Sequence, residues 1–377
     1  MLAIAWILAA LLAGSLVYCV LTVMAAMRYR SVRVEPAASG PSISILKPLS
    51  GIDDGLEENL RSFFEQRYPS FEILFALRSG KDPAVAVVER LRAEYRSIPS
   101  RLMIVGDAPY PNAKVFSLDR MLAAAQFDLV VMADSDVRVT ADALATVAAE
   151  FADPNLGLAT CPYRAVPGRS FWSTLEAIGL NTEFFSGVLV ARMLEGMKFA
   201  LGPTIAARRE TLQAIGGFDA VKDFLAEDFV MGRLAAQRGF GVILSSCVIE
   251  HRIGAQRLGP NLRHRLRWNR STRRSRPAGY VGQLFTNPFP IALLLWVAQP
   301  KWWPAVLLTL VFRAAAGSAT AGYVLRDRLT ARLFWLLPLQ DLVSFVCWLG
   351  GFFGNTILWR GRKYLLLRDG RFELLRE

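Results

Sequence analysis

The chain has 377 residues, of which 53% are hydrophobic and 20% charged, and its formal net charge is +12. At this length it can bury a large core, and the apolar excess indicates membrane segments in addition to a globular domain. Nine arginines and no acidic residue lie between Arg252 and Arg276, which excludes a uniformly basic surface. Because this stretch leads directly into apolar segments, we expect no nucleic-acid partner.

The four cysteines, at positions 19, 161, 247 and 347, are widely spaced along the chain. There is no CxxC motif and no Cys–His cluster. We therefore predict neither a disulfide framework nor a zinc site, which fits a catalytic domain facing the cytoplasm.

Residues 1–27 are almost wholly apolar and long enough to span a bilayer. Positive charges follow this run, at Arg28, Arg30 and Arg33. The positive-inside rule then places the N-terminus outside and the following domain in the cytoplasm. A cleaved signal peptide, the alternative, carries its charges before a shorter apolar run. Residues 28–42 are expected to form a linker.

Residues 43–280 alternate short apolar runs with helical patterns, which predicts an α/β domain with a mostly parallel, Rossmann-like sheet. In such domains ligands bind beyond the carboxyl ends of the strands. The expected strands are Ile43–Leu46, Phe71–Ala76, Leu102–Val105, Leu129–Ala133, Leu158–Cys161 and Val242–Ile249. The expected helices are Gly55–Gln66, Pro83–Tyr95, Val115–Ala125, Ala141–Phe151 and Val230–Gln237.

Residues 281–355 contain three further apolar segments, 284–298, 303–325 and 333–353, and the last two are each long enough to span. Positive charge marks both the 326–332 loop and the basic tail, residues 356–377. If both are cytoplasmic, one segment is re-entrant or interfacial, as we expect, whereas three full crossings put the tail outside.

Two charged residues, Arg313 and Asp341, fall inside the two long C-terminal apolar segments. Charges at that depth are costly unless they are paired or face a polar cavity. Counted from the 326–332 loop, the two residues lie at similar depths on antiparallel neighbours, so we predict that they pair. The alternative is that each contacts water separately.

Four short signatures occur in a fixed order that suits a nucleotide-sugar site. They are Lys47-Pro48-Leu49, Asp134-Ser135-Asp136, Leu225-Ala226-Glu227-Asp228-Phe229 and His264-Arg265-Leu266-Arg267-Trp268. The second ends an apolar run, so its two carboxylates are expected at a strand end. There Asp134 and Asp136 can hold a Mg²⁺ or Mn²⁺ ion with the diphosphate, whereas a bare tripeptide of this kind is otherwise a solvated turn.

Asp228 is the candidate general base, because inverting transfer needs a carboxylate that takes the proton of the acceptor hydroxyl. We place its neighbour Glu227 in the acceptor site. The alternative for both residues is a helix cap, since acids are common at helix starts.

The arginine-rich signature supplies cationic and aromatic groups. Arg267 can bind phosphate oxygens of the nucleotide-sugar, and Trp268 and His264 can wall the acceptor site. The other arginines can face anionic lipid headgroups.

Three further residues are assigned to the nucleotide-sugar. They are Lys47, Lys114, which can add positive charge near the diphosphate, and Asp82, which can contact the nucleotide base. The alternatives are a solvated lysine at 114 and a helix cap before Pro83. His251 is interpreted as structural rather than catalytic.

The segment Phe171–Phe199 is rich in large apolar residues. It can form amphipathic helices that lie on the membrane and guide a lipid acceptor inward. The alternative is an ordinary pair of core helices.

With these residues the chain resembles the ceramide glucosyltransferase family, whose members are inverting glycosyltransferases with a GT-A domain tethered to membrane. The resemblance covers nearly the whole chain. It is carried by Lys47-Pro48-Leu49, Asp82-Pro83, Asn112-Ala113-Lys114, Asp134-Ser135, Leu225-Ala226-Glu227-Asp228 and Arg267-Trp268. His264 stands where the family usually has Gln or Arg.

The resemblance implies that Asp82 binds nucleotide, that Asp134 binds sugar-nucleotide and metal, and that Asp228 is the base. It implies transfer of a sugar from a UDP-sugar to a lipid hydroxyl, first of all glucose to ceramide, by a multi-pass enzyme of the bacterial inner membrane. The similar hopanoid-biosynthesis glycosyltransferases imply an alternative, N-acetylglucosamine added to a hopanoid polyol. A processive polysaccharide synthase needs more apolar segments, and an inactive scaffold would have broken carboxylate signatures.

Overall fold

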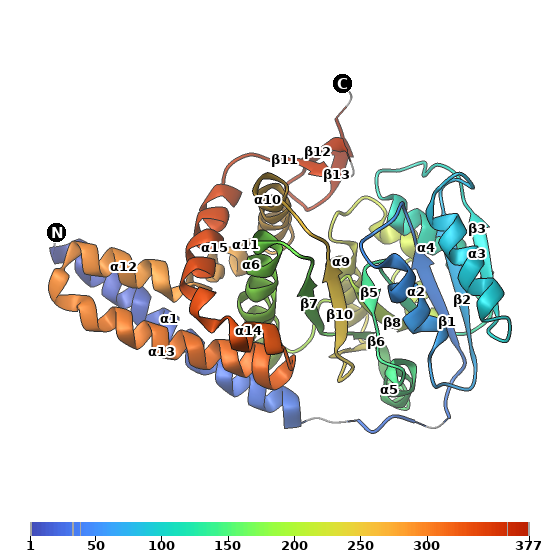
Figure 1. Cartoon of the computed structure of the whole chain (residues 1–377), viewed down its shortest axis with the longest axis horizontal. Coiled ribbons are helices and arrows are strands. Elements are labelled where there is room, and N and C mark those ends of the chain that lie inside the picture. The colour runs from blue at the N-terminus through green and yellow to red at the C-terminus, as the bar shows by residue number, and fades with distance from the viewer. Residues whose placement is uncertain (1, 32–33, 38, 360, 376–377) are drawn as a thin grey trace. The chain divides into compact units, whose positions relative to one another are not determined.

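The structure is a computed structural model that describes residues 2–31, 34–37, 39–359 and 361–375 (Figure 1). It divides into two compact units, which we call the helical unit and the sheet unit. The helical unit comprises residues 1–32, 164–196 and 255–369, and the sheet unit comprises 33–163, 197–254 and 370–377. The expected 43–280 domain is therefore interrupted, since 164–196 and 255–280 belong with the apolar helices.

The sheet unit is built on a seven-stranded sheet with the order β3-β2-β1-β4-β8-β6-β9. All neighbouring strands are parallel except at β8, which is antiparallel to both β4 and β6. The strands are β1 Ile43–Pro48, β2 Phe71–Leu77, β3 Ser100–Ile104, β4 Leu129–Ala133, β6 Leu156–Thr160, β8 Thr204–Arg208 and β9 Gly241–Leu244.

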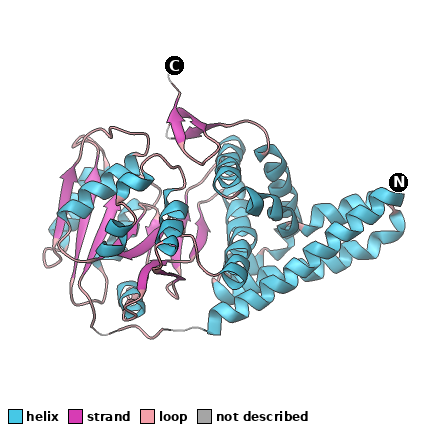
Figure 2. Cartoon of the chain, turned by 180° about the vertical axis from the view of Figure 1, so that it is seen from behind, coloured by secondary structure: helices cyan, strands magenta, loops and turns pink. Residues whose placement is uncertain are grey.

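The central strands are apolar along their whole length because both faces of the sheet are covered. Strands β2, β4 and β6 are buried at every residue. Figure 2 shows helices on both sides of these strands. The helices of this unit are α2 Leu56–Phe64, α3 Ala84–Glu94, α4 Ala113–Ala124, α5 Ala143–Glu150, α8 Arg209–Ala214, the 3₁₀ turn η2 Phe218–Val221 and α9 Glu227–Gln237. The expected α/β class with a mostly parallel sheet is confirmed.

One hydrophobic cluster fixes two of these helices against the sheet. Helix α4 contributes Val115 and Met121, and helix α9 contributes Val230 and Met231, to a core that includes Met132 of β4. The starts of α4 and α9 are thereby held at the end of β4, where the polar residues described below gather.

The expected strand Val242–Ile249 is wrong as a single strand. The chain leaves the main sheet after β9, turns at Ser245, whose hydroxyl accepts a hydrogen bond from the amide of Cys247 at 3.0 Å, and begins β10 at Ile249. Strand β10, Ile249–Ile253, pairs antiparallel with the short β5, Val137–Arg138. Strand β7, Tyr163–Pro167, follows β6 along the chain.

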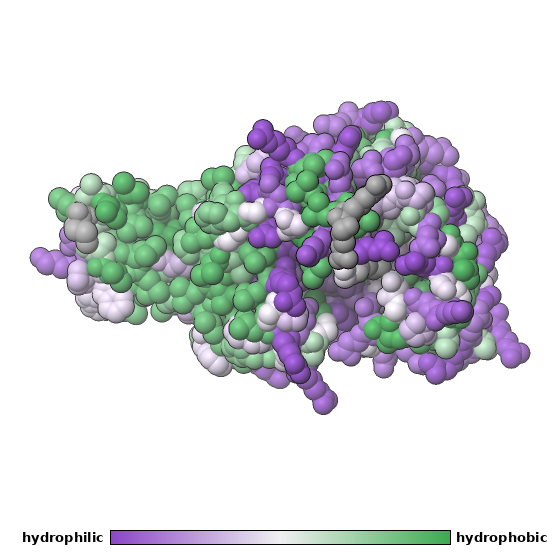
Figure 3. Space-filling view, turned by 90° about the horizontal axis from the view of Figure 1, so that it is seen from above, coloured by the Kyte–Doolittle hydropathy of each residue, from purple (hydrophilic) through white to green (hydrophobic). Residues whose placement is uncertain are grey.

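The helical unit contains the long apolar helices. Among the described residues, four helical stretches have the length and composition to cross a membrane, namely 2–31, 171–195, 300–324 and 334–351. A fifth candidate is a helix pair, 277–286 and 288–298, bent by 62°. Their surfaces are largely hydrophobic in the space-filling view (Figure 3).

The elements of this unit are α1 Leu2–Ser31, α6 Phe171–Gly179, η1 Leu180–Phe184, α7 Phe185–Glu195, α10 Leu258–Ser275, α11 Pro277–Gly282, η3 Gln283–Thr286, α12 Pro288–Ala298, η4 Pro300–Trp302, α13 Trp303–Gly317, η5 Ser318–Val324, α14 Arg328–Arg332, η6 Phe334–Leu336 and α15 Leu337–Gly351, followed by the antiparallel strands β11 Thr356–Trp359 and β12 Arg362–Leu366. Of these, η1 and η5 are π-helical turns. Strand β13, Phe372–Leu374, follows.

Three sequence expectations differ from this arrangement. Helix α1 runs on to Ser31, so the expected linker at 28–42 begins inside it. The expected basic tail carries the short strands β11, β12 and β13, which the sequence did not predict. Within the stretch 171–195, 67% of the apolar window is buried, against 22% for α1, which favours the packed core alternative over helices lying on a membrane.

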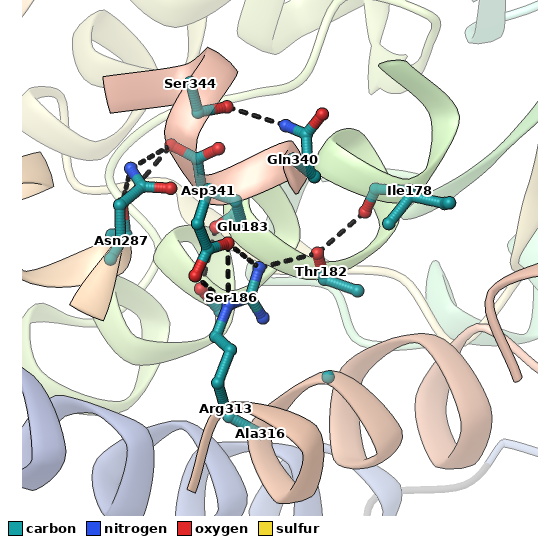
Figure 4. A network of polar contacts seen from close by, with 12 residues as sticks. Ile178, Thr182, Glu183, Ser186, Asn287, Arg313, Ala316, Gln340, Asp341 and Ser344 are labelled. Atoms are coloured by element: carbon teal, nitrogen blue, oxygen red, sulfur yellow. Dashed lines mark hydrogen bonds and ion pairs between the residues drawn. The ribbon is translucent and has the colours of Figure 1, made fainter. Parts of the chain in front are cut away.

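The predicted pairing of Arg313 with Asp341 is confirmed. Arg313 Nε lies 3.0 Å from each carboxylate oxygen and its NH2 group 2.9 Å from Oδ1 (Figure 4). The two residues are 4% and 0% exposed. The guanidinium also donates to the hydroxyl of Thr182 at 3.0 Å. Because both charges are enclosed among apolar helices, each depends on the other for compensation.

We predict strong coupling in a double-mutant cycle of Arg313→Ala and Asp341→Ala. Each single change leaves one enclosed charge without its partner and is expected to lower the free energy of unfolding by about 3–5 kcal/mol. The double variant is expected to lose clearly less than the sum. Unfolding in detergent, followed by circular dichroism, measures the effect, and additive losses would remove the pair as a source of stability.

Candidate active site

The carboxylates of Asp134 and Asp136 stand at the carboxyl end of β4. The backbone amide of Asp134 donates to the carbonyl of Pro203 at 3.0 Å, which ties this turn to the start of β8. The hydroxyl of Ser135 donates to the carboxylate of Asp53, and the amide of Asn59 to the Ser135 carbonyl at 3.3 Å. The turn is thus fixed from three sides rather than being a solvated one.

Lys114 is the centre of the site. Its Nζ lies 2.7 Å from Asp134 Oδ1 and 3.1 Å from Glu227 Oε1, and it donates to the Gly202 carbonyl at 3.5 Å. Burial opposes the charge, but the carboxylates of Asp134 and Glu227 outweigh it and raise the pKa of Lys114. The side chain is 20% exposed, so it is not the solvated lysine of the alternative interpretation.

Asp228 lies in the first turn of α9 and faces the same space. Burial, and next the negative charge of Glu227, raise the pKa of Asp228 to about 7. A carboxyl with this pKa can take up a proton near neutral pH. A β-carbon at Gly202 would meet Asp228 Oδ2 at 3.0 Å, so any larger residue there would crowd this carboxylate.

A small pocket opens between these groups. Its polar lining comes from Lys114, Asp134, Glu227 and Asp228, and its apolar lining includes Met132. The remaining lining residues are Pro48, Leu118, Ala133, Gly202, Ile205 and Met231. Three carboxylates and one ammonium therefore share one pocket at the carboxyl end of the central strand.

Asn112 holds the two sides of this pocket together, a role that sequence reasoning missed. Its Oδ1 caps α4 by accepting from the Val115 amide at 3.2 Å. Its Nδ2 donates to the Phe224 carbonyl at 2.9 Å and to Glu227 Oε2 at 3.4 Å. The asparagine and the lysine two residues later thus bind the same segment before α9.

Lys47 supports the turn of Asp134 from inside the protein. It is fully buried, donates to the Asp134 carbonyl at 2.5 Å and lies 4.0 Å from the centre of the Phe63 ring. Burial lowers the pKa of Lys47 to about 7, although the neighbouring aspartates oppose this shift. Its predicted contact with the nucleotide-sugar stays a prediction.

Asp82 is engaged by backbone amides. Its carboxylate accepts from Gly51 at 3.1 and 3.0 Å and from Ala84 at 2.9 Å. It therefore satisfies the free amide at the start of α3, as in the alternative interpretation, and also joins the loop after β1. Binding of a nucleotide base by Asp82 stays a prediction.

Asp136 has a partner that the sequence reading treated as structural. His251, carried by β10, places its Nε2 3.2 Å from Asp136 Oδ2. Burial raises the pKa of Asp136, but the charge and hydrogen bond of His251 outweigh burial and lower it. The antiparallel pairing of β10 with β5 brings His251 next to Asp136. No local sequence motif predicts this contact.

The residues present fit a hard divalent cation. Asp136 Oδ1 is enclosed and has no hydrogen-bond partner, so one carboxylate oxygen is left for a ligand. In the described part of the chain no three His, Cys, Asp or Glu side chains form a metal group. The protein would therefore supply the carboxylates of Asp134 and Asp136, and phosphate oxygens and water the other positions.

A distant part of the chain braces the loop before α9. The amide of Phe372 donates to the Asp223 carbonyl at 2.9 Å, and Arg371 forms a β-bridge with Phe224. The Arg371 guanidinium lies 5.5 Å from the centre of the Phe224 ring. Because Phe224 also binds Asn112, this contact supports the segment that leads into Asp228.

The arginine-rich signature His264-Arg265-Leu266-Arg267-Trp268 lies on α10, which belongs to the helical unit. His264 Nδ1 lies 2.7 Å from Glu176 Oε1. The Trp268 ring packs against those of Phe184 and His264, with centroids 5.8 and 5.5 Å apart. The predicted roles of His264, Arg267 and Trp268 toward nucleotide-sugar and acceptor stay predictions.

Comparison with known proteins gives this geometry a family context. The model of glycosyl transferase family 21 matches residues 6–372. Ceramide glucosyltransferase 1 of Caenorhabditis elegans is 28% identical over 216 residues, which are 57% of this chain and 46% of the relative. The ceramide glucosyltransferase of Komagataella phaffii is 35% identical over 120 residues, 30% of this chain and 23% of the relative. The chain thus spans about half or less of these relatives.

Among solved structures, the mannosyltransferase PcManGT from Pyrobaculum calidifontis, in complex with GDP-Man and Mn²⁺, has a similar fold. The TM-score is 0.55 with 21% identity, and the match covers 93% of this chain and 99% of that one. The expected GT-A fold is therefore confirmed.

We predict that Lys114→Met destabilises the protein by about 3–5 kcal/mol, because Asp134 and Glu227 then face each other without a cation. The loss is expected to be larger at pH 8 than at pH 5, since protonation of carboxylates removes the repulsion. Lys81→Met, at an exposed position, is the matched control. Denaturant unfolding measures both, and equal stability of the two variants would contradict a central role for Lys114.

Proposed function

The chain belongs to glycosyltransferase family 21, and from this premise we propose that it transfers a sugar from a UDP-sugar to a lipid hydroxyl, glucose to ceramide in the first place. The single observation that carries the proposal is the shared pocket of Lys114, Asp134, Glu227 and Asp228. It combines positive charge for a diphosphate, carboxylates for a metal, and a carboxyl whose pKa is about 7.

In the proposed reaction Asp228 is the general base. The acceptor hydroxyl gives its proton to the Asp228 carboxylate while its oxygen attacks the anomeric carbon of the donor sugar. The bond from that carbon to the diphosphate oxygen breaks on the opposite face, so the configuration inverts. UDP leaves with the bonding electron pair, and the proton remains on Asp228 until solvent removes it.

The other residues of the pocket bind and orient the donor. A divalent cation held by Asp134 and Asp136 would neutralise charge on the departing diphosphate. Lys114 adds a fixed positive charge beside Asp134. We propose further that Lys47 and Asp82 support the nucleotide through the backbone they bind, and that Arg267 contacts phosphate oxygens.

The lipid acceptor is supported by two independent features. The relatives of this chain in Caenorhabditis elegans and Komagataella phaffii are ceramide glucosyltransferases. The helical unit has four helical stretches apolar enough to lie in a membrane. We propose that Trp268 and His264 wall the acceptor site. Glu227, which the sequence placed there too, binds Asn112 and Lys114 and sets the charge beside Asp228, and its place in the acceptor site stays a prediction.

We predict that purified protein in detergent, with Mg²⁺ or Mn²⁺, UDP-glucose and ceramide, forms glucosylceramide detectable by mass spectrometry. Asp228→Asn is expected to lower the rate at least 100-fold, because general-base catalysis contributes about 10²–10⁴. Asp219→Asn changes an exposed aspartate and is the matched control.

Parallel reactions test the donor and the acceptor. UDP-N-acetylglucosamine with a hopanoid polyol is the main alternative pair, and its product would replace the ceramide assignment while keeping the mechanism. Hydrolysis of UDP-sugar without a lipid product would contradict the lipid acceptor. Absence of any UDP-sugar turnover or binding would contradict the function itself.

The pH dependence should report on Asp228. Its carboxylate must be deprotonated to act, so kcat/KM is expected to rise with pH and to level off above about 7. Glu227→Gln removes a negative charge that raises this pKa, so the rise is expected to shift to lower pH. Initial rates over a pH series for both proteins measure the shift. An unchanged pH profile would mean that the group responsible for the pH dependence is not Asp228.

A further inference from the structure

Two irregular points in the apolar helices of the helical unit, η1 and the break at Asn287, are joined by a polar contact between Glu183 and Asn287. A π-helical turn, η1, separates α6 from α7, and a second one, η5, ends α13. Asn287 stands at the 62° break between η3 and α12. Turns of this kind mark functional sites more often than regular helix, and broken helices at membrane depth are tolerated where they line a cavity or are buried in protein.

The π-turn η1 sends three consecutive polar side chains to three different neighbours. Asn181 donates to Asp327 at 2.9 Å, and the Thr182 hydroxyl receives the Arg313 guanidinium at 3.0 Å. Both residues are fully buried, so these two contacts are closed structural links. Glu183, the third, points toward Asn287 (Figure 4).

Glu183 differs from Asn181 and Thr182 because its side chain is a carboxylate and is only partly buried. Its Oε1 accepts from Asn287 Nδ2 at 2.9 Å and from the Thr286 hydroxyl at 3.3 Å, both neutral donors. Among the described residues it forms no ion pair within 4.0 Å, and the nearby Arg313 is engaged by Asp341. A carboxylate among apolar helices is costly, which points to a ligand that compensates it.

Asn287 provides a second, independent indication. The residue is 1% exposed, its Nδ2 is used by Glu183, and its Oδ1 is buried without a hydrogen-bond partner. Buried polar atoms normally have a hydrogen-bond partner. The enclosed Oδ1 of Asn287 therefore lacks a donor, and it lies on the residue that binds the partly buried carboxylate of Glu183.

We propose that Glu183 and Asn287 bind the polar end of the lipid acceptor, a neutral lipid that donates hydrogen bonds from a hydroxyl or an amide N–H. The inference rests on the proposed function and names the class of its acceptor. Asn287 Oδ1 and the carboxylate of Glu183 are both hydrogen-bond acceptors, so the ligand must donate. The negative charge of Glu183 repels an anionic phosphate, which argues against anionic phospholipids and free phosphate as occupants.

The test compares Glu183→Gln with Glu195→Gln in lipid nanodiscs. Glu195 is the last residue of α7, the helix that follows η1. It is exposed and pairs with Arg276, so it is a matched control. Glu183→Gln is expected to raise KM for ceramide about tenfold, because a hydrogen bond to a charged group is lost. KM for UDP-glucose, the rate of UDP-glucose hydrolysis and the melting temperature are expected to stay unchanged.

A second measurement uses the unaltered protein and a ceramide that carries a photoactivatable diazirine near its polar end. After irradiation, labelled peptides are expected from 180–187 and 283–291. Unlabelled ceramide should compete, diacylglycerol should compete weakly because it lacks the amide, and phosphatidic acid should not compete. Labelling elsewhere, or competition by phosphatidic acid equal to that of ceramide, would overturn the proposal.

The two proposals fail in different ways. If the Glu183→Gln variant glucosylates ceramide with the same KM as the unaltered protein, the proposed function stands and this acceptor site is wrong. Protein that neither hydrolyses UDP-glucose nor glucosylates a lipid fails the proposed function first, whatever the labelling pattern.

Discussion

The candidate site depends on one largely enclosed ammonium group. Asp134 comes from the end of β4 and Glu227 from the start of α9, and Lys114, at the start of α4, lies within hydrogen-bonding distance of both carboxylates. The hydrophobic core that holds α4 and α9 on the sheet therefore also sets the charge balance of the pocket. The raised pKa of Asp228 follows from the same constraint, since burial and Glu227 act on it together.

Local sequence patterns predicted the carboxylates of this site, because each lies directly beside a recognisable strand or helix pattern. An apolar run followed by Asp134, and acids at the start of a helical pattern for Asp228, locate the carboxylates correctly at a strand end and a helix start. The contacts of Asn112, His251 and Arg371 could not be predicted, because each joins segments more than 100 residues apart. Strand β8 was missed although it lies inside the sheet, between β4 and β6, since its short sequence carries no distinct pattern.

In the helical unit the pairing of Arg313 with Asp341 was predictable, because equal depth on antiparallel helices brings two charges together. The π-turns were not, since an inserted residue changes which face a side chain occupies without changing hydrophobicity. Asn181, Thr182 and Glu183, which lie in η1, each bind a different neighbour. The division into units was also unpredictable, because 164–196 resembles any buried helical segment in sequence.

The brace that residues 371 and 372 form on residues 223 and 224 has a consequence for biosynthesis. The ribosome makes the apolar stretches 300–324 and 334–351 before it makes this brace. The segment that leads into Asp228 can therefore reach its final contacts only after both apolar stretches have been synthesised. The local structure around Asp228 is thus among the last parts of the chain to be completed.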